Sequence, residues 1–417
     1  LVIAGLNERR REAGKVGKER RKIGRGVVPP AGVGGAHGLD VLRREHRVAL
    51  RPLGVGRARH RHVRPRRHQH QRPGQAAARR RESRELPQCL ANYVNQNGIE
   101  LVLLAGDLFD SASAYRDTAE SLSAALGQMA AQVYIAPGNH DWYGPGSPYL
   151  TVQWPDNVHI FTQPHLEAMA WPEKRLVLHG AAFTASEQSA GFLSGFAAPK
   201  DGNLHIGLLH GEIAPAEARY DPIWKEEIAA SGLAYLALGH IHKRTEPLTY
   251  GRTVCAWPGC PEGRGFDELG EKGFYAGTID DTGKVALTFV PFARRRYEIL
   301  TVDVTGQAPR AAIEAALPTE TVQDLYRILL TGETGEGGAQ AEALQEALAD
   351  RFYALEIRDQ TRLAEDLWAR AAEDSLRGLF LRDLKSRLDS ARTEEERQRI
   401  TMAARFGLAA LDHRDLG

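Results

Sequence analysis

The stretch LVLLAGDLFD, residues 101–110, is a short apolar run that leads directly into Gly106, Asp107 and Asp110. A brief, uniformly apolar run predicts a buried strand, and a glycine directly after it predicts a sharp turn. Three other segments repeat this order: Gly138-Asn139-His140-Asp141, His210-Gly211 and Gly239-His240-Ile241-His242. The sequence therefore predicts polar side chains at the ends of several strands, where loops aim them into a common crevice.

The segments around these clusters alternate between strand and helix patterns. Strands are predicted at 101–104, 132–136, 175–179, 204–209, 234–238, 253–256, 273–279 and 284–290. Helices are predicted from about residue 86 to the stop signal Asn97-Gly98, and over roughly 115–129. This mixture predicts a layered α/β domain with two sheets over residues 83–292.

Two further regions are predicted beyond residue 292. Residues 293–358 contain strand patterns at 296–304, 324–331 and 352–358 and helical patterns at 309–316 and 340–350, with a glycine-rich flexible tip at 332–338. Over 361–411, leucines recur at helical spacing among many charges. The region 359–417 is therefore expected to be helical and to dock a partner, or alternatively to form a lid packed on its own core.

Overall composition limits the class of protein. With 417 residues and 42% hydrophobic content, the chain can bury a large core and is expected to form two or three domains. No run of eighteen apolar residues occurs, so no membrane span is predicted. Three cysteines cannot pair completely, which indicates a reducing cytoplasm. Cys255 and Cys260 lack the spacing of a zinc knuckle and are interpreted as ordinary thiols.

The first 82 residues differ from the rest of the chain. Residues 1–80 hold 22 of the 54 Lys+Arg but only 5 of the 53 Asp+Glu, and residues 1–82 contain no aromatic residue, serine, threonine, methionine or cysteine. Most of this segment is expected to be disordered, because it can bury little apolar area. Three origins are open: mistranslation or fragmentation of the coding region, a nucleic-acid-binding arm, or an unrecognised module. The histidines at 60, 62, 68 and 70 are interpreted as compositional.

The four clusters carry residue types that bind metal ions. A carboxylate such as that of Asp107 can share its two oxygens between two cations, and Asn139, His210 and His240 add neutral donors that suit Mn, Fe or Zn. His242 is predicted to reach a second ion, and Gly138 and Gly239 to let the backbone approach closely. His140, beside Asp141, is predicted to act on substrate phosphate. Two ions could activate a water for attack on phosphorus while His140 protonates the leaving group.

These motifs resemble motifs two to five of the calcineurin-like metallophosphoesterases. The resemblance covers residues 86–292. Trp257-Pro-Gly-Cys260, Gly265-Phe266-Asp-Glu268 and Glu271-Lys-Gly273 look like the segment that follows the last histidines in DNA repair exonucleases of the SbcD type, in particular the bacterial YhaO-like branch.

The resemblance implies an architecture and a set of partners. It implies a four-layer α/β/β/α sandwich for residues 83–292, a small α/β capping domain at 293–358 and a C-terminal helical region. It also implies manganese-dependent cleavage of DNA, an SbcC-like coiled-coil ATPase as partner, and a homodimer. By position, Asp107 would bridge two ions, Asn139, His210 and His240 would hold one of them, and His242 the other. His140 would be the catalytic histidine.

One motif of the family is missing. Its members carry Asp-x-His at the end of the first strand, but the only aspartate before Asp107 is Asp40, which lacks the histidine, and His46 has no strand-loop context. Three classes of function therefore remain open: a DNA nuclease subunit, a phosphoesterase acting on small nucleotides or phosphoproteins, and a non-catalytic interaction subunit. The chain as written is expected to bind the second ion poorly and to cleave little DNA.

Overall fold

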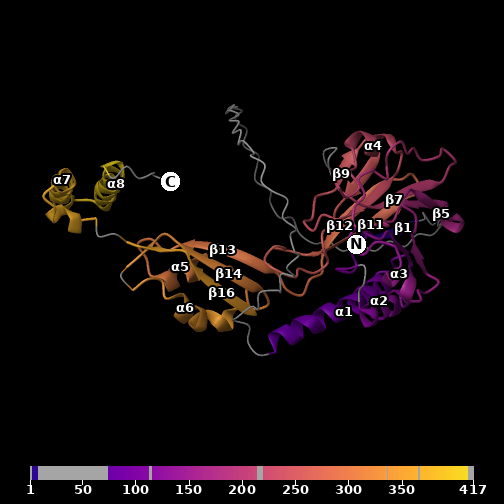
Figure 1. The fold of residues 1–417 in the computed structure, drawn as a ribbon, viewed down its shortest axis with the longest axis horizontal. Helices are drawn as coiled ribbons and strands as arrows, with labels where there is room; N and C mark the ends of the chain where they lie inside the picture. The colour runs from indigo at the N-terminus through magenta and orange to yellow at the C-terminus, as the bar shows by residue number, and fades with distance from the viewer. Residues whose placement is uncertain are drawn as a thin grey trace, which may run out of the picture. The chain divides into compact units, whose positions relative to one another are not determined.

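The fold was analysed in a computed structural model that describes residues 2–7, 74–111, 115–213, 219–335, 337–364 and 367–411. The described residues form a mixed α/β structure, which confirms the predicted fold class (Figure 1). None of the helices within these residues is both long and apolar enough to cross a membrane. The predictions for residues 8–73 lie outside the described residues. They include those for Asp40, for His46 and for the histidines at 60, 62, 68 and 70.

Two six-stranded sheets form the larger part of the structure. The first has the order β12 (Val285–Pro291), β11 (Gly273–Asp280), β1 (Val2–Asn7), β2 (Leu101–Leu104), β3 (Gln132–Ile135) and β4 (Val158–Ile160). The second has the order β5 (Glu167–Trp171), β6 (Leu176–Gly180), β7 (Leu204–His210), β8 (Tyr235–Gly239), β10 (Thr253–Ala256) and β9 (Leu248–Tyr250). β2, β3 and β4 are parallel, as are β6, β7 and β8, so the carboxyl ends within each set meet at one edge.

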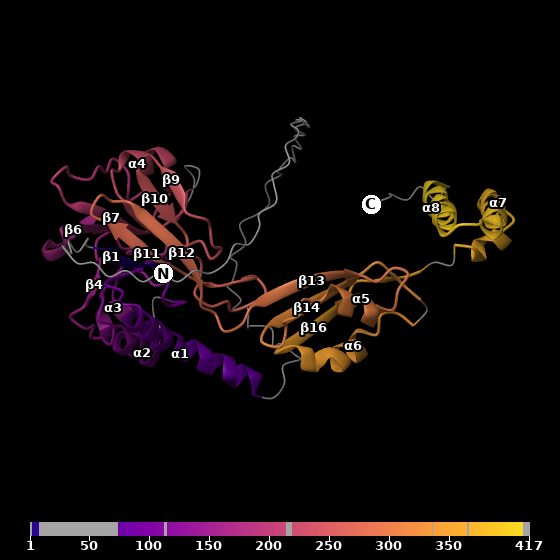
Figure 2. The same cartoon turned by 180° about the vertical axis from the view of Figure 1, so that it is seen from behind.

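Burial of both faces explains why β2 is a continuous apolar run in the sequence. In β2, Leu101 and Leu103 join a cluster that includes residues of both sheets, whereas Val102 and Leu104 face a second cluster with helix residues. A strand covered on both faces has no solvent side, so each of its positions is apolar. The second cluster contains residues of α1 (Gln75–Gln96) and α2 (Arg116–Gly127), which lie side by side (Figures 1 and 2). The short helix α3 (Pro148–Thr151) adds Tyr149 to that cluster.

The outer face of the second sheet has its own apolar cluster. Leu236 and Leu238 of β8 pack there with Ile228 of α4 (Lys225–Ala230), while Tyr235 and Ala237 face the first cluster. The 3-10 turn η1 (Pro172–Lys174) connects β5 and β6. The four-layer arrangement stays a prediction.

The N-terminal boundary predicted near residue 82 lies too far along the chain. Helix α1 begins at Gln75, and the side chains of Arg79 and Glu82 are largely buried in ion pairs with Glu262 and Arg295. These partners lie far away in sequence. The basic composition of residues 1–82 therefore gave no sign that the last of these residues belong to the folded structure. Residues Val2–Asn7 form β1, so the disorder expected for most of this segment does not include them.

A smaller α/β sheet follows, within the region 293–358 where strand and helix patterns alternate. This three-stranded parallel sheet has the order β13 (Tyr297–Asp303), β14 (Leu325–Thr331) and β16 (Ala354–Asp359). Helices α5 (Pro309–Ala316) and α6 (Ala341–Leu348) share one apolar cluster with it, and the 3-10 turn η2 (Ala349–Arg351) follows α6. Within the predicted flexible tip, β15 (Glu333–Thr334) pairs with β17 (Arg362–Leu363).

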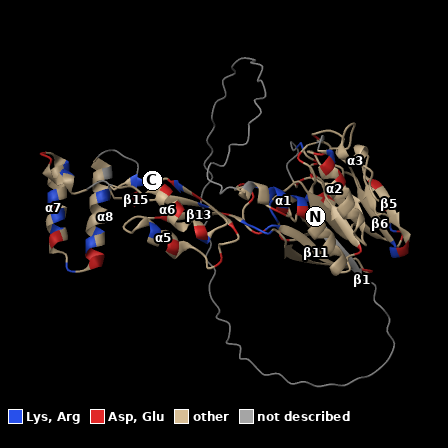
Figure 3. Ribbon diagram, turned by 90° about the horizontal axis from the view of Figure 1, so that it is seen from below, with Lys and Arg blue, Asp and Glu red and all other residues tan. Residues whose placement is uncertain are grey.

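The helical prediction for 361–411 is wrong over its first part. Residues 361–375 contain β17 and the 3-10 turn η3 (Ala369–Ala372), and the first long helix, α7 (Leu376–Ser390), starts where the Ser375 hydroxyl accepts a hydrogen bond from the Gly378 N–H at 3.2 Å. α8 (Glu394–Leu411) packs against α7 through Leu381, Leu384, Ala404 and Leu408. Charged residues of both signs lie along the two helices (Figure 3).

Candidate metal centre

Asp107 stands in a tight turn directly after β2. Both Gly106 and Asp107 have left-handed backbone conformations, with φ of 75° and 51°. A left-handed conformation is strained for a residue with a side chain, and such strain concentrates at functional sites. The loop after β3 approaches this turn closely: a Cβ added at Gly138 would lie 2.4 Å from Asp107 Oδ1. Gly138 is therefore required for the two loops to meet, as its predicted supporting role implies.

The carboxylate of Asp141 connects these two loops through hydrogen bonds. Its buried carboxylate accepts five hydrogen bonds, from the N–H groups of Asp107, Leu108, Phe109 and Gly138 and from the Tyr149 hydroxyl. Burial raises the pKa of Asp141, and the Tyr149 hydrogen bond opposes that rise. Because its oxygens are already occupied by donors, Asp141 shapes the site rather than binding metal.

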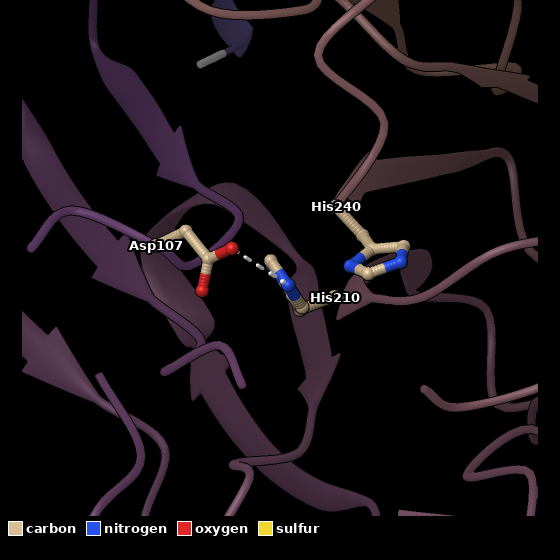
Figure 4. A group of neighbouring side chains, drawn as sticks. All are labelled: Asp107, His210 and His240. Atoms are coloured by element: carbon tan, nitrogen blue, oxygen red, sulfur yellow. Dashed lines mark ion pairs between the residues drawn. The ribbon is translucent and has the colours of Figure 1, made fainter. Parts of the chain in front are cut away.

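Four predicted ligands converge at the strand ends. His210 Nε2 lies 2.9 Å from Asn139 Oδ1 and 3.3 Å from Asp107 Oδ2, and His240 Nδ1 lies 3.2 Å from Asn139 Oδ1. The ligand atoms of Asp107, His210 and His240 all lie within 4.8 Å of one another. Figure 4 shows Asp107 and His210 directed toward each other, with His240 beside them. This spacing allows one cation to contact all four side chains.

The hydrogen bonds of His210 indicate that the site favours a positive charge. Its Nδ1 donates to the carbonyl of Ala105 at 2.8 Å, so in the neutral ring Nε2 carries a lone pair. That lone pair faces the oxygens of Asp107 and Asn139, which are also acceptors. Burial alone would lower the pKa of His210, but the hydrogen bond and charge of Asp107 raise it above its ordinary value. A proton or a metal ion at Nε2 relieves the same crowding of lone pairs.

The ionisation states of Asp107 and His240 also favour a bound cation. Burial opposes ionisation of Asp107, but the hydrogen bond to His210 brings its pKa below the ordinary value, so the carboxylate is ionised. Burial, followed by the nearby His210, lowers the pKa of His240 to about 4, which leaves its ring neutral. A neutral imidazole is the form that binds metal ions. One carboxylate oxygen, one amide oxygen and two imidazole nitrogens suit a divalent transition metal.

Gly239 allows the strand before His240 to approach the first loop. A Cβ at this position would lie 1.7 Å from the carbonyl oxygen of Ala105, which no relaxation of a side chain could relieve. His240 itself has a φ of 85°, so its backbone is also in the left-handed region. The ring of Tyr220 lies against it, with centroids 4.9 Å apart. The predicted supporting role of Gly239 thus has a steric basis.

Two predicted site residues lie outside this cluster. The backbone N–H of His140 donates to Asp107 Oδ1 at 2.9 Å, but His140 is exposed at the margin of the site. His242 is exposed, and its Nδ1 contacts Glu268 Oε1 at 2.7 Å. Their roles as catalytic residue and second-ion ligand stay predictions.

Sequence reasoning missed three residues that support the site. Glu268 holds His242, Tyr149 holds Asp141, and the Trp257 indole N–H donates to the carbonyl of Gly211 at 3.0 Å, next to His210. Glu268 and Trp257 act on residues 26 and 46 positions away, so no local spacing indicated them, and Tyr149 bonds Asp141 from the next helix, α3. Glu268 and Trp257 do fall in the segment after His242 that carried the SbcD-type resemblance.

Comparison with known proteins agrees with this geometry. Residues 68–244 match the family described as calcineurin-like phosphoesterase. The chain is therefore similar to metallophosphoesterases over less than half of its length. It is also 29% identical over 301 residues to the uncharacterized metallophosphoesterase YhaO of Bacillus subtilis (strain 168), a match that covers 63% of this chain and 70% of that protein. The matched segment includes all the predicted metal ligands, and it supports metal-dependent phosphoester hydrolysis.

Proposed function

We propose that this protein is a two-metal phosphodiesterase that cleaves DNA, as the nuclease subunit of an SbcCD-like repair complex. The observation that carries the phosphoesterase part is the convergence of Asp107, Asn139, His210 and His240 at the ends of neighbouring strands. The DNA part rests on the SbcD-type segment from Trp257 to Gly273, which packs beside the site through Trp257 and Glu268.

The side chains divide the chemistry among them. Asp107, Asn139, His210 and His240 hold a divalent ion, for which we propose manganese, and His242 contributes to a second. Bound metal would polarise the phosphate and supply a hydroxide at near-neutral pH. The exposed ring of His140 is free to approach a phosphate oxygen, while its backbone N–H fixes the orientation of Asp107. His140 would then donate a proton to the leaving oxygen.

Strand β1 explains why the second ion would bind weakly. The ligand-bearing strands β2 and β3 are parallel, but β1 runs antiparallel to β2, with Val2 opposite Leu103 and Ala4 opposite Leu101. The carboxyl end of β1, Asn7, therefore lies at the opposite edge from Asp107. Its sequence, Val-Ile-Ala-Gly-Leu-Asn, also contains no carboxylate and no imidazole. β1 occupies a position next to β2 without supplying a metal ligand.

We propose that the native sequence at this position differs. An apolar strand ending in Asp-x-His, encoded in another reading frame upstream of the codon for Gln75, would complete the second site. Sequencing that region of the gene tests the idea directly. If none of its frames encodes such a strand, the explanation by mistranslation is wrong.

The partners belong to the same proposal. Outside residues 1–80 the chain has 32 Lys+Arg against 48 Asp+Glu, so DNA would be repelled except near the metal centre. DNA affinity would then come largely from the small α/β unit, as a capping domain, or from a coiled-coil ATPase docked on α7 and α8. A homodimer and a cytoplasmic location, which agrees with three free cysteines, complete the proposal.

The test is hydrolysis by the purified full chain with Mn²⁺. Linear duplex DNA, a phosphoserine peptide and a cyclic nucleotide are compared, with Asp107→Asn as the inactive control. We expect slow, Mn²⁺-dependent cleavage of DNA alone, weaker at higher salt and faster with the ATPase. Hydrolysis of only the peptide or nucleotide would refute the DNA assignment. Rapid DNA cleavage by the chain alone would refute the weak second site.

A further inference from the structure

His242 and Glu268 form a pair with unequal exposure. His242 Nδ1 lies 2.7 Å from Glu268 Oε1, and the two side chains are 58% and 9% exposed. A nearly buried carboxylate thus reaches out to a ring that is mostly in solvent. Surface ion pairs are usually mobile and contribute little. Here one partner is fixed, so the position of the ring is set by the carboxylate.

Short hydrogen bonds hold the Glu268 carboxylate in place. Its Oε2 accepts the backbone N–H of Arg264 at 2.7 Å, and the N–H of Glu268 donates to the carbonyl of Gly265 at 3.0 Å. The same loop is attached to α1, because Arg79 bonds the Glu262 carboxylate at 2.8 Å and the Gly263 carbonyl at 2.9 Å. The carboxylate cannot turn away from His242 without breaking its hydrogen bond to the Arg264 N–H.

The backbone of His242 is fixed from the same segment. Its carbonyl accepts a hydrogen bond from Nζ of Lys272, a buried lysine, at 3.2 Å. A Cβ at Gly259 would lie 2.6 Å from that carbonyl oxygen, so the segment passes very close to His242. Residues 259–272 therefore determine both the backbone and the ring orientation of this histidine.

We infer that Glu268 is a positioning residue that keeps His242 in the Nδ1–H form, so that Nε2 presents its lone pair to the second metal ion. An ionised carboxylate only accepts hydrogen bonds, and therefore a neutral His242 ring must donate from Nδ1. Such a carboxylate–histidine pair fixes the tautomer and strengthens the ring nitrogen as a ligand. His210 is oriented instead by the Ala105 carbonyl. This inference rests on the proposed two-metal function.

Glu268→Gln tests the inference because it preserves shape but reverses one hydrogen bond. The Arg264 N–H can only donate, so the glutamine oxygen would face it. The glutamine NH₂ would then face His242 Nδ1 and stabilise the opposite, Nε2–H form, which cannot bind metal through Nε2. Glu271→Gln, an exposed residue of the same segment, is the matched control.

Two measurements on the metal-free and the Mn²⁺-titrated full chain decide the matter. Nitrogen-15 NMR at pH 8, with the signal assigned by its loss in His242→Gln, should show the Nδ1–H form in the wild type and in Glu271→Gln, and the Nε2–H form in Glu268→Gln. The weaker Mn²⁺ affinity, measured by electron paramagnetic resonance, should fall about 10- to 100-fold in Glu268→Gln while the stronger one is retained.

The outcomes separate this inference from the proposed function. An unchanged His242 tautomer in Glu268→Gln would overturn the positioning role, whatever the metal content. Equal loss of both Mn²⁺ affinities would overturn it too, because it would show a general structural role. If the wild type binds one ion only but the tautomer still switches, the two-metal function fails and the positioning of His242 by Glu268 stands.

Discussion

The two halves of the metal centre are built in different ways. Asp107, Asn139, His210 and His240 come from four strand ends and contact one another directly, with His210 fully buried. His242 stands apart with a largely exposed ring and depends on one carboxylate. Preorganised ligands lose little conformational freedom when metal binds. We therefore expect the first ion to bind tightly to this chain and the second weakly.

The difference originates in the sheet. The first group uses the carboxyl ends of parallel strands, which meet at one edge, and glycines at 138 and 239 let those ends approach. The second site would need a ligand from a strand beside β2, but β1 runs the opposite way there. On the proposed two-metal function, the first group is therefore complete, whereas the second lacks the ligands of one strand end.

Removing the charge of the first group should have the largest effect. Asp107→Asn keeps the shape of the side chain but removes the only carboxylate among the four ligands. We expect the stronger Mn²⁺ affinity to fall by more than about 100-fold, because even residues behind a ligand typically contribute 10- to 100-fold. Calorimetric titration with Mn²⁺ measures it. A loss smaller than tenfold would show that the first group is not the tighter site.

Substitution of Asp141, which supports the first group of ligands, should have the second largest effect. In Asp141→Asn the amide nitrogen must face backbone N–H groups that the carboxylate now accepts, so buried donors lose their partner. We expect a loss of roughly 2–4 kcal/mol in the free energy of unfolding, measured with urea on the metal-free protein. Asp156→Asn, at an exposed position, should change stability by less than about 0.5 kcal/mol. Equal effects of both variants would contradict the role of Asp141.

A buried histidine pair lies in the second sheet, outside the group of possible metal ligands found among the described residues. His179 Nε2 lies 2.9 Å from His205 Nδ1, and His205 Nε2 lies 3.0 Å from Asp201 Oδ1. Burial, followed by the neighbouring His205, lowers the pKa of His179 to about 4. Next to Asp107, the buried His210 instead has a raised pKa. The partner, not burial alone, decides the charge of a histidine.

This lowered pKa predicts acid sensitivity. An unfolded histidine titrates near pH 6.5. Between about pH 6.5 and 4, His179 is therefore protonated in the unfolded chain but neutral in the folded one. Stability from this group is therefore complete above pH 6.5 and is lost as the pH falls toward 4, by at most about 2–3 kcal/mol. Urea unfolding of the metal-free protein at pH 7.5 and 4.5 measures the loss. His179→Gln should show a smaller loss, and an unchanged one would remove His179 as its source.

The sequence indicated the strands and the first group well, for identifiable reasons. β2 was predicted to the residue because Leu101 and Leu103 face one core and Val102 and Leu104 another, which leaves no polar position. Each ligand follows directly on such an apolar run in the sequence, so the ligands could be predicted to meet at the strand ends. β5 was missed because its residues alternate between half-buried and exposed, as at a sheet edge.

Features held by distant residues could not be predicted. The start of α1 depends on Arg79 and Glu82, whose partners Glu262 and Arg295 lie far along the chain. Glu268 reaches His242 across a loop, and no spacing rule connects them. The placement of β1 depends on its pairing with β2 and β11, which a six-residue segment does not specify by itself.

The smallest effect should come from an exposed ion pair between the two halves. Arg264, beside the loop that holds Glu268, pairs with Asp110, which follows the Asp107 turn. Both side chains are well exposed, so the pair should contribute less than about 1 kcal/mol and should weaken with salt. Asp110→Asn should therefore leave both Mn²⁺ affinities within about twofold of the wild type, as titration at 50 and 500 mM salt would show. A loss of the weaker affinity alone, present only at low salt, would mean that the exposed pair, rather than the Arg264 N–H bond to Glu268, holds the second half in place. The difference between the two Mn²⁺ affinities would then depend on ionic strength, because an exposed ion pair and not a buried hydrogen bond would hold the second group of ligands.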